Sequence, residues 1–163
     1  MEVNDLYNVA EIRLTYLNHF SPDDLPQVRN SKDAYEILLQ CWEVGKIELV
    51  MQSKLLLLNQ KCKVLGIVNI ASGSVCKVPI DLKQIFAATL KSGATAIIAA
   101  HNHPSGDITP GVLAKDFAQK LKRGADLLDI RLLDYLIISP EDYYSFCDRE
   151  LLEGYNSTSP LDN

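Results

Sequence analysis

The sequence predicts an α/β domain in which a mixed β-sheet is flanked by helices on both faces. Short apolar runs of strand length alternate along the chain with segments whose apolar residues recur at helical spacing. Two of the runs follow each other across a short polar turn, which is typical of an antiparallel hairpin. At 163 residues the chain is long enough to bury a sizeable core, so we expect one main domain.

The N-terminal part is expected to hold a strand, an exposed connection and a helix. Residues 11–17 alternate apolar and polar side chains, which predicts the strand. Residues 21–30 carry two prolines and several polar side chains, which indicates a connection. Ser31 is a suitable N-cap for a helix whose apolar residues follow at helical spacing and which ends near Gly45.

The middle of the chain predicts a hairpin followed by a second helix. Residues 53–59 and 64–71 are apolar runs on either side of a polar turn. Residues 75–78 are expected to form a short extended piece after a Ser-Gly-Ser break. Asp81 is placed to cap a helix that continues to about Lys91, where a Ser-Gly pair ends it.

The last part repeats the order strand, helix, strand. The expected elements are a strand over 95–100, a loop over 102–108, a helix from 109 to about 128, a strand over 130–138 and a short strand or turn over 143–147. Thr109 is a favourable N-cap, and Pro110 suits the first helical position. We therefore divide the chain into an N-terminal strand and connection (1–30), a main domain (31–153) and a polar, flexible tail (154–163).

Charge and composition narrow the class of function. The net charge of −5 argues against nucleic-acid binding, because DNA contact favours a basic face, although a local basic patch stays open. No apolar run approaches the roughly 20 residues of a membrane span, and the polar, acidic N-terminus is unlike a secretory signal. We therefore expect a cytoplasmic protein with an unknown protein partner and no membrane association.

The four cysteines do not predict a disulfide framework or a cysteine metal site. Cys41, Cys62, Cys76 and Cys147 form no Cys-x-x-Cys pair. In a cytoplasmic protein such residues are expected to be free, buried thiols.

Residues 100–107, Ala-His-Asn-His-Pro-Ser-Gly-Asp, carry the strongest chemical signal in the chain. They follow an apolar run that predicts a buried strand, and residues two apart in a strand face the same side. His101 and His103 are therefore expected to direct both imidazoles at one point, which suits zinc or a similar divalent ion. The loop residues beside them are Asn102, Pro104, Ser105 and Gly106. Two half-exposed histidines without any ligand remain the alternative.

Three other enzyme classes fit this motif less well. In HNH nucleases the three residues are dispersed over a larger metal motif. Zinc nucleobase deaminases need His-x-Glu together with Pro-Cys-x-x-Cys, and neither pattern is present. Ser105 lacks the Gly-x-Ser-x-Gly context of a serine hydrolase.

Several segments around the histidine loop carry a family pattern. They are Ser-Lys-Asp-Ala-Tyr at 31–35, Leu-Leu-Asn at 57–59, Lys-Val-Leu-Gly at 63–66, Asp-Leu-Lys-Gln-Ile-Phe at 81–86, the loop at 101–107, Leu-Asp-Tyr-Leu-Ile-Ile at 133–138 and Tyr-Tyr-Ser-Phe at 143–146. Together they resemble the RadC family of JAB/MPN metallopeptidase-like domains, over about residues 11–153. The resemblance implies a cytidine-deaminase-like α/β architecture and, through the family name, a link to DNA repair.

The resemblance also implies a zinc site at the open end of the sheet. In this class two histidines and one aspartate hold the metal, and a water fills the fourth position. A glutamate acts as general base, and a serine stabilises the developing oxyanion. His101 and His103 match the two histidine positions.

The other positions of the family site differ in this chain. The aspartate position is Ala114, the serine position is Gly111 and the glutamate position is Met51. Where the family usually has a histidine after Leu-Asp, this chain has Tyr135. Alanine and methionine offer neither a hard oxygen ligand nor a proton acceptor, so zinc is expected to bind weakly or not at all.

Neighbouring carboxylates offer one replacement ligand. Asp116 is two residues beyond Ala114, so a helix turns it to the other side, and an odd offset puts Glu48 on the other face of an extended strand. Asp107, in the loop itself, is the best replacement. We therefore expect a catalytically degenerate RadC-like domain that acts as a binding or scaffold module. The alternative is an active zinc-dependent hydrolase with an unconventional third ligand.

Overall fold

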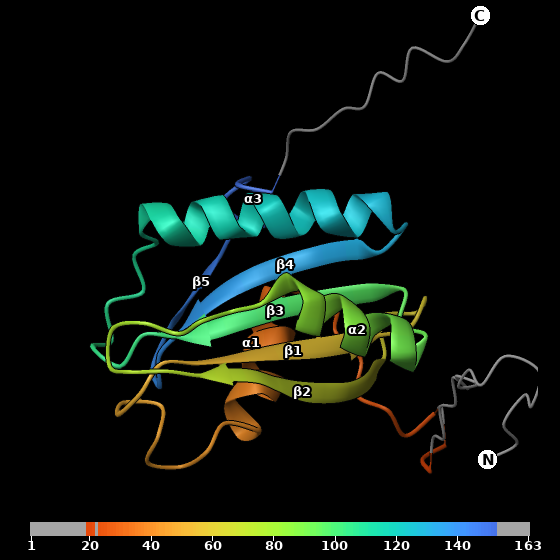
Figure 1. Ribbon diagram of the computed structural model, residues 1–163. Coiled ribbons are helices and arrows are strands. Elements are labelled where there is room, and N and C mark those ends of the chain that lie inside the picture. The colour runs from red at the N-terminus through yellow and green to blue at the C-terminus, as the bar shows by residue number, and fades with distance from the viewer. Residues whose placement is uncertain (1–18, 22, 153–163) are drawn as a thin grey trace, which may run out of the picture.

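Five strands form one mixed sheet with helices on both faces, as Figure 1 shows for the computed structural model. The structure describes residues 19–21 and 23–152, so the predicted strand at 11–17 and the predicted tail at 154–163 lie outside it. The elements are α1 (Ser31–Gln40), β1 (Gln52–Leu58), β2 (Val64–Ser72), α2 (Leu82–Ser92), β3 (Ala96–Asn102), α3 (Val112–Leu127), β4 (Arg131–Ile138) and β5 (Tyr143–Ser145). The predicted fold class is confirmed.

The strand order β2-β1-β3-β4-β5 places β3 at the centre of the sheet. β1 and β2 form the predicted antiparallel hairpin, and β1 is also antiparallel to β3. β3 and β4 are parallel and are joined through α3, whereas β5 adds a short antiparallel edge. The loop that follows β3 therefore begins in the middle of the sheet.

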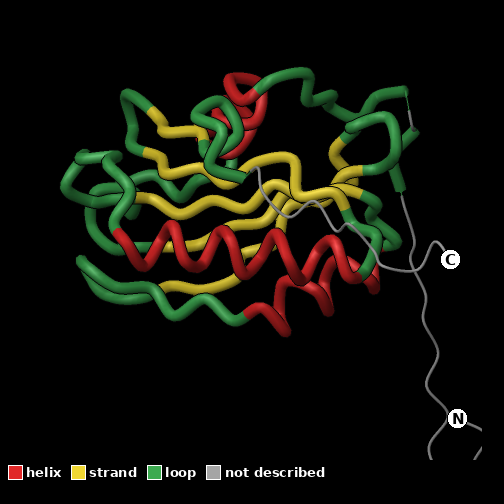
Figure 2. The backbone as a smooth tube through the Cα atoms, turned by 90° about the horizontal axis from the view of Figure 1, so that it is seen from above, coloured by secondary structure: helices red, strands yellow, loops and turns green. Residues whose placement is uncertain are grey.

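Side-chain alternation along the strands divides the core into two layers. On β3, Ile97 and Ala99 pack with the cluster that contains α2 and α3, whereas Ile98 and Ala100 pack with α1. Figure 2 shows the same arrangement from above, with α2 and α3 on one side of the strands and α1 on the other. Within the described residues, no helix combines the length and the apolar character that crossing a bilayer requires.

The first helix is shorter than the sequence predicts and has a different cap. Asn30, not Ser31, is the N-cap, and its side-chain oxygen accepts a hydrogen bond from the backbone N–H of Asp33. The Ser31 hydroxyl instead contacts Tyr143 and donates to Asp148 across the domain. The helix ends at Gln40, and the residues up to position 50 form turns.

The third helix begins later than predicted. Its N-cap is Gly111, without a side-chain hydrogen bond, and Val112 is its first residue. Thr109 is not the cap, because its own backbone N–H donates to the carboxylate of Asp107 at 2.9 Å. This local Asx-type contact delays the start of the helix by two residues.

Two smaller expectations are also corrected. Residues 75–78 form bends and irregular backbone in place of an extended strand. The four cysteines were expected to be buried, but none of them is: three are exposed and Cys62 is half-buried. They lie in turns and loops, at the end of α1, in the β1–β2 turn, after β2 and after β5, where no core covers them.

Asn102 connects the end of β3 to the chain that leads into β1. Its side-chain nitrogen donates to the carbonyl oxygens of Ile47 and Val50, at 2.6 and 2.8 Å. Its side-chain oxygen accepts from the backbone N–H of Gln52 at 2.6 Å. The residue is fully buried, so these three bonds fix the segment that carries Met51 against the sheet.

A buried carboxylate on β4 organises the turn after β5. Asp134 accepts hydrogen bonds from the Ser145 hydroxyl and from the backbone N–H groups of Tyr135 and Cys147. Burial raises the pKa of Asp134 to about 6, and these hydrogen bonds offset only part of that shift. The ionised carboxylate is therefore costly to the fold in spite of its three donors.

We predict that Asn102→Ala will destabilise the fold by about 2–4 kcal/mol, because it leaves one buried N–H and two buried carbonyl groups without a partner. Urea-induced unfolding will measure the change. The matched control is Gln60→Ala, which removes an exposed amide from the β1–β2 turn and should cost less than about 0.5 kcal/mol. Equal stability of the two variants would contradict the structural role of Asn102.

The pKa of Asp134 predicts how stability depends on pH. Because this pKa is higher in the folded than in the unfolded chain, stability is lost as pH rises through about 6 and regained as pH falls towards 4. Between about pH 7.5 and about pH 5, the unmodified protein should gain about 1 kcal/mol relative to Asp134→Asn, which does not titrate. Unfolding by urea at both pH values will test this, and parallel pH profiles of the two proteins would refute it.

Candidate functional site

A cleft of about 510 Å³ opens where β3 ends and α3 begins. It brings together eight positions that the sequence singles out, which are Met51, His101, His103, Ser105, Asp107, Gly111, Ala114 and Tyr135. The remaining lining residues are Cys76, Lys77, Val78, Ile80, Thr109, Leu113 and Phe117. Asn102 lies on the other face of the sheet, and the loop residues Pro104 and Gly106 do not line the cleft.

The two histidines converge as their spacing predicts. His101 is the second-last residue of β3, and its side chain is buried. His103 follows the strand and lies on the same side of it. The two Nε2 atoms are 2.9 Å apart, and the ring centroids are 4.8 Å apart. The role of the pair as metal ligands remains a prediction.

The outer nitrogen of each imidazole is also engaged. Nδ1 of His103 lies 2.5 Å from the backbone oxygen of Asp107, which can only accept, so Nδ1 carries a proton. In neutral His103 the Nε2 atom is then an acceptor, and Nε2 of His101 donates to it. Nδ1 of His101 accepts from the hydroxyl of Tyr135 at 2.8 Å. The three hydrogen bonds form one continuous series from the buried Tyr135 hydroxyl to the loop carbonyl of Asp107.

Burial keeps His101 and Tyr135, the inner members of this series of hydrogen bonds, neutral. Desolvation lowers the pKa of His101 to about 3, and the neighbouring His103 adds to the effect. Burial also raises the pKa of the Tyr135 hydroxyl. His101 is therefore a neutral imidazole at ordinary pH, which is the form that binds a metal or exchanges a hydrogen bond.

The two imidazoles fit two positions of a zinc site. A metal held by both Nε2 atoms would require His101 to move its proton to Nδ1 and donate to the oxygen of Tyr135, which can accept. The two Nε2 atoms lie 2.9 Å apart and share a hydrogen bond, so both rings would have to turn away from that bond before both nitrogens could bind one ion.

The described residues do not complete the ligand set of a catalytic zinc ion. Among them no three His, Cys, Asp or Glu side chains lie together in a group that could hold a metal. The carboxylate of Asp107 accepts from the backbone of Thr109, whereas its carbonyl serves His103. Hydrogen bonds from Thr109 lower the pKa of Asp107. The expected replacement ligand lines the cleft but does not form a three-ligand group with the two histidines.

The three divergent positions form part of the cleft wall. Met51 leads into β1, and its backbone is held by hydrogen bonds with Gly73 and Ser74. Gly111 caps α3, and a Cβ added there would meet nothing within 4 Å. Ala114 lies on the first turn of α3, half-buried. Larger polar side chains at positions 111 and 114 would therefore project into the cleft.

The two rejected carboxylates do not line the cleft. Asp116 is exposed on α3, as the helical turn predicts. Glu48 lies in a turn, so the argument from strand alternation does not apply to it.

Sequence reasoning missed the role of Tyr135 as the hydrogen-bond partner of His101. That contact depends on the parallel pairing of β3 and β4, in which Ala99 pairs with Tyr135.

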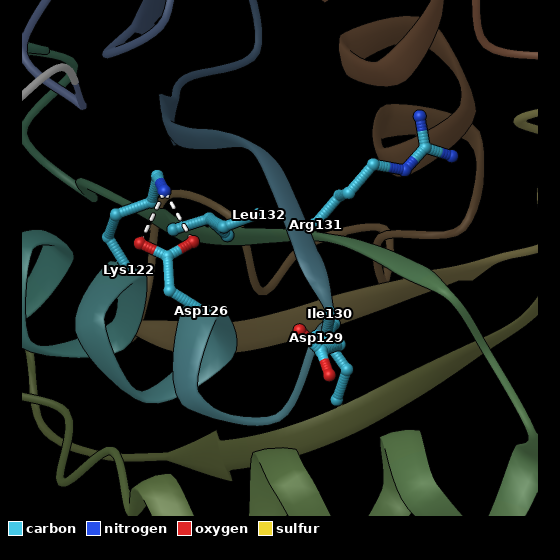
Figure 3. Close-up of a pocket in the computed structure, with 6 residues that line it drawn as sticks. All are labelled: Lys122, Asp126, Asp129, Ile130, Arg131 and Leu132. Atoms are coloured by element: carbon cyan, nitrogen blue, oxygen red, sulfur yellow. Dashed lines mark hydrogen bonds and ion pairs between the residues drawn. The ribbon is translucent and has the colours of Figure 1, made fainter. Parts of the chain in front are cut away.

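A second cavity, of about 430 Å³, lies at the other end of β4 (Figure 3). Its lining comes from the end of α3 and the start of β4, and consists of Lys122, Asp126, Asp129, Ile130, Arg131 and Leu132. The Lys122 ammonium group pairs with both carboxylate oxygens of Asp126, at 2.5 and 2.6 Å. This exposed pair within one helix is an ordinary surface feature, so the cleft with the two histidines is the better candidate.

Comparison with known protein families agrees with this geometry. The RadC-like JAB domain family matches residues 28–151. A UPF0758 protein of Flavobacterium johnsoniae is 34% identical over 124 residues, which cover 76% of this chain and 53% of that protein.

Two further relatives match the chain. A UPF0758 protein of Porphyromonas gingivalis is 40% identical over 98 residues, which cover 60% of this chain and 43% of that protein. The UPF0758 protein YfjY of Escherichia coli K12 is 36% identical over 98 residues, covering 60% and 61%. The chain thus spans about half the length of the curated relatives it matches. Because the family match extends from residue 28 to residue 151, the chain belongs to the RadC family of JAB domains.

Proposed function

We propose that this RadC-like JAB domain no longer hydrolyses a substrate and binds a protein partner through the cleft beside His101 and His103. One observation carries the proposal. The positions at which the family resemblance expects a general base, a serine and a third zinc ligand are Met51, Gly111 and Ala114, and all three line the cleft. The cleft is kept, but these side chains can neither take up a proton nor bind a hard cation.

The lining suits a short peptide segment with an apolar side chain. Met51, Val78, Leu113 and Phe117 give the cleft apolar walls. Such a surface favours binding of an apolar group, and a few polar groups fix its orientation. Lys77, in the same lining, provides a polar contact for the peptide backbone. The proposal takes a DNA-repair setting from the family name, and in that setting a protein partner suits the net charge of −5 better than DNA does.

The second candidate function is an active zinc-dependent hydrolase. The convergence of the two imidazoles favours it. The outer N–H of His103 donates to the Asp107 carbonyl, as the outer N–H of many metal-binding histidines does, and the outer nitrogen of His101 lies beside the Tyr135 hydroxyl, which can also accept. Cys76 and Asp107 line the same cleft, and a change in the loops that carry them would be needed to supply a third ligand. Zinc would then polarise a carbonyl group or activate a water.

We predict that protein purified without chelator will contain less than one equivalent of zinc, because two imidazoles hold it weakly. Ala114→Asp should increase zinc affinity at least about tenfold by adding a third ligand. Metal analysis and calorimetric titration will measure this. The matched control is Lys115→Asp, which adds a carboxylate at an exposed neighbouring position and should leave zinc affinity unchanged. Tight, equimolar zinc in the unmodified protein would favour the hydrolase.

We predict binding without cleavage when a library of fluorescent peptides and isopeptides is tested. A general base contributes typically 10²–10⁴-fold to a rate, so a site without one, and without its oxyanion group, should give no measurable turnover. Peptides with an apolar side chain should bind, and Ala114→Trp should abolish their binding by filling the cleft, as fluorescence anisotropy will show. Lys115→Trp, at the exposed neighbouring position, is the control and should bind as the unmodified protein does.

Two results would overturn this proposal. The first is chelator-sensitive cleavage by the unmodified chain that His101→Ala abolishes. The second is the absence of any peptide whose binding depends on Ala114. The triple variant Met51→Glu, Gly111→Ser, Ala114→Asp should remain folded, because all three side chains line an open cleft.

A further inference from the structure

The outer edge of β2 is open over most of its length in the described part of the chain. β2 is the longest strand of the sheet, with nine residues, and β1 is its only neighbouring strand there. The other edge of the sheet, β5, has only three residues. Long open edges expose unpaired backbone N–H and C=O groups and are usually covered, whereas very short ones need no cover.

The chain before α1 reaches this edge at the start of β2. Gln27 forms an isolated antiparallel bridge with Lys63, and backbone hydrogen bonds of 2.8 and 2.9 Å join Val64 to Pro26 and Val28 to Cys62. Asp23 forms an ion pair with Lys63 at 3.9 Å. The segment that leads back towards residue 18 therefore begins beside the open edge of β2.

We propose that residues 11–17 of this chain pair with β2 as a sixth strand on its open edge. This segment, Glu-Ile-Arg-Leu-Thr-Tyr-Leu, alternates apolar and polar side chains, as a strand with one covered face does. Its seven residues are close in length to the free edge, which comprises residues 65–72, because the N–H of Val64 already bonds to Pro26. The occupant is therefore close in the sequence and of the right pattern and length.

The length of the connection determines the direction of pairing. Nine residue steps separate Leu17 from Pro26 and reach at most roughly 30 Å when fully extended. The hydrogen bond from Asp24 N–H to the Ser21 carbonyl makes a turn that shortens this reach. A parallel arrangement would need the connection to span the whole of β2, roughly 30 Å, so the added strand must be antiparallel.

The apolar face of the added strand has a matching surface. Ile12, Leu14 and Tyr16 share one face of an extended chain. On β2, three half-buried apolar side chains pack at the margin of the core layer that contains α2, and they are Leu65, Val68 and Ala71. Pairing on this edge lays the first set beside the second and leaves Arg13 and Thr15 on the other side.

Hydrogen exchange of the full chain, followed by mass spectrometry, tests the proposal. Leu14→Pro removes a backbone donor in the middle of the added strand. It should raise exchange in peptides from 64–72 about tenfold at the edge amides, because their partner is lost. Exchange over 96–102 should stay unchanged, which also shows that the variant is folded. Asn4→Pro, the same change outside the segment, should have no effect.

The same experiment separates the occupants. The proposal is supported if residues 64–72 are protected in the unmodified protein and lose this protection in Leu14→Pro. The protection should also be independent of protein concentration, and light scattering should show a monomer. Two results would overturn it. One is exchange of 64–72 that is equal in the unmodified protein and Leu14→Pro. The other is protection that rises with concentration together with a dimer, because a second copy would then cover the edge.

Discussion

The alternation of side chains at the end of β3 is the constraint on which the site depends. His101 and His103 point to the side of the sheet that carries α2 and α3, and Asn102 between them points to the side of α1. The histidines therefore form one end of the cleft. Asn102 fixes the segment that carries Met51, which forms part of the cleft wall. Residues 101–103 thus supply the two imidazoles of the site and also hold the Met51 segment of the cleft wall in place.

Desolvation sets the chemistry that this tripeptide presents. His101 is buried in the central strand beside Tyr135, where a charged imidazole would lose its hydration without gaining a carboxylate partner. His101 therefore acts as a hydrogen-bonding group, and the donor in each bond of the network follows from the backbone carbonyl of Asp107, which can only accept. Asp134, on the same strand as Tyr135, shows that even three donors do not fully offset burial of a carboxylate.

Periodicity predicted the strands and the convergence of the histidines, because both depend on local alternation along the chain. The starts of two helices were predicted wrongly. A residue can cap a helix only when its side chain is not engaged by another partner, and such partners are often distant in the sequence. Ser31 bonds Tyr143 and Asp148, which are distant in sequence, and Thr109 is held by Asp107. The contact of Tyr135 with His101 depends on the pairing of β3 and β4, which no single segment encodes. The prediction that the cysteines are buried was wrong, because all four lie in turns and loops.

The three divergent residues are physically consistent with one another. Without a third ligand, a cation at His101 and His103 would be weakly held, and an acidic base at position 51 would face the neutral imidazole of His101 across a partly apolar cleft. Such a carboxylate would be desolvated without a compensating charge. Methionine at 51, glycine at 111 and alanine at 114 remove that cost together, whereas any one alone would leave an incomplete polar site. The proposed loss of hydrolysis therefore predicts that the three positions change together.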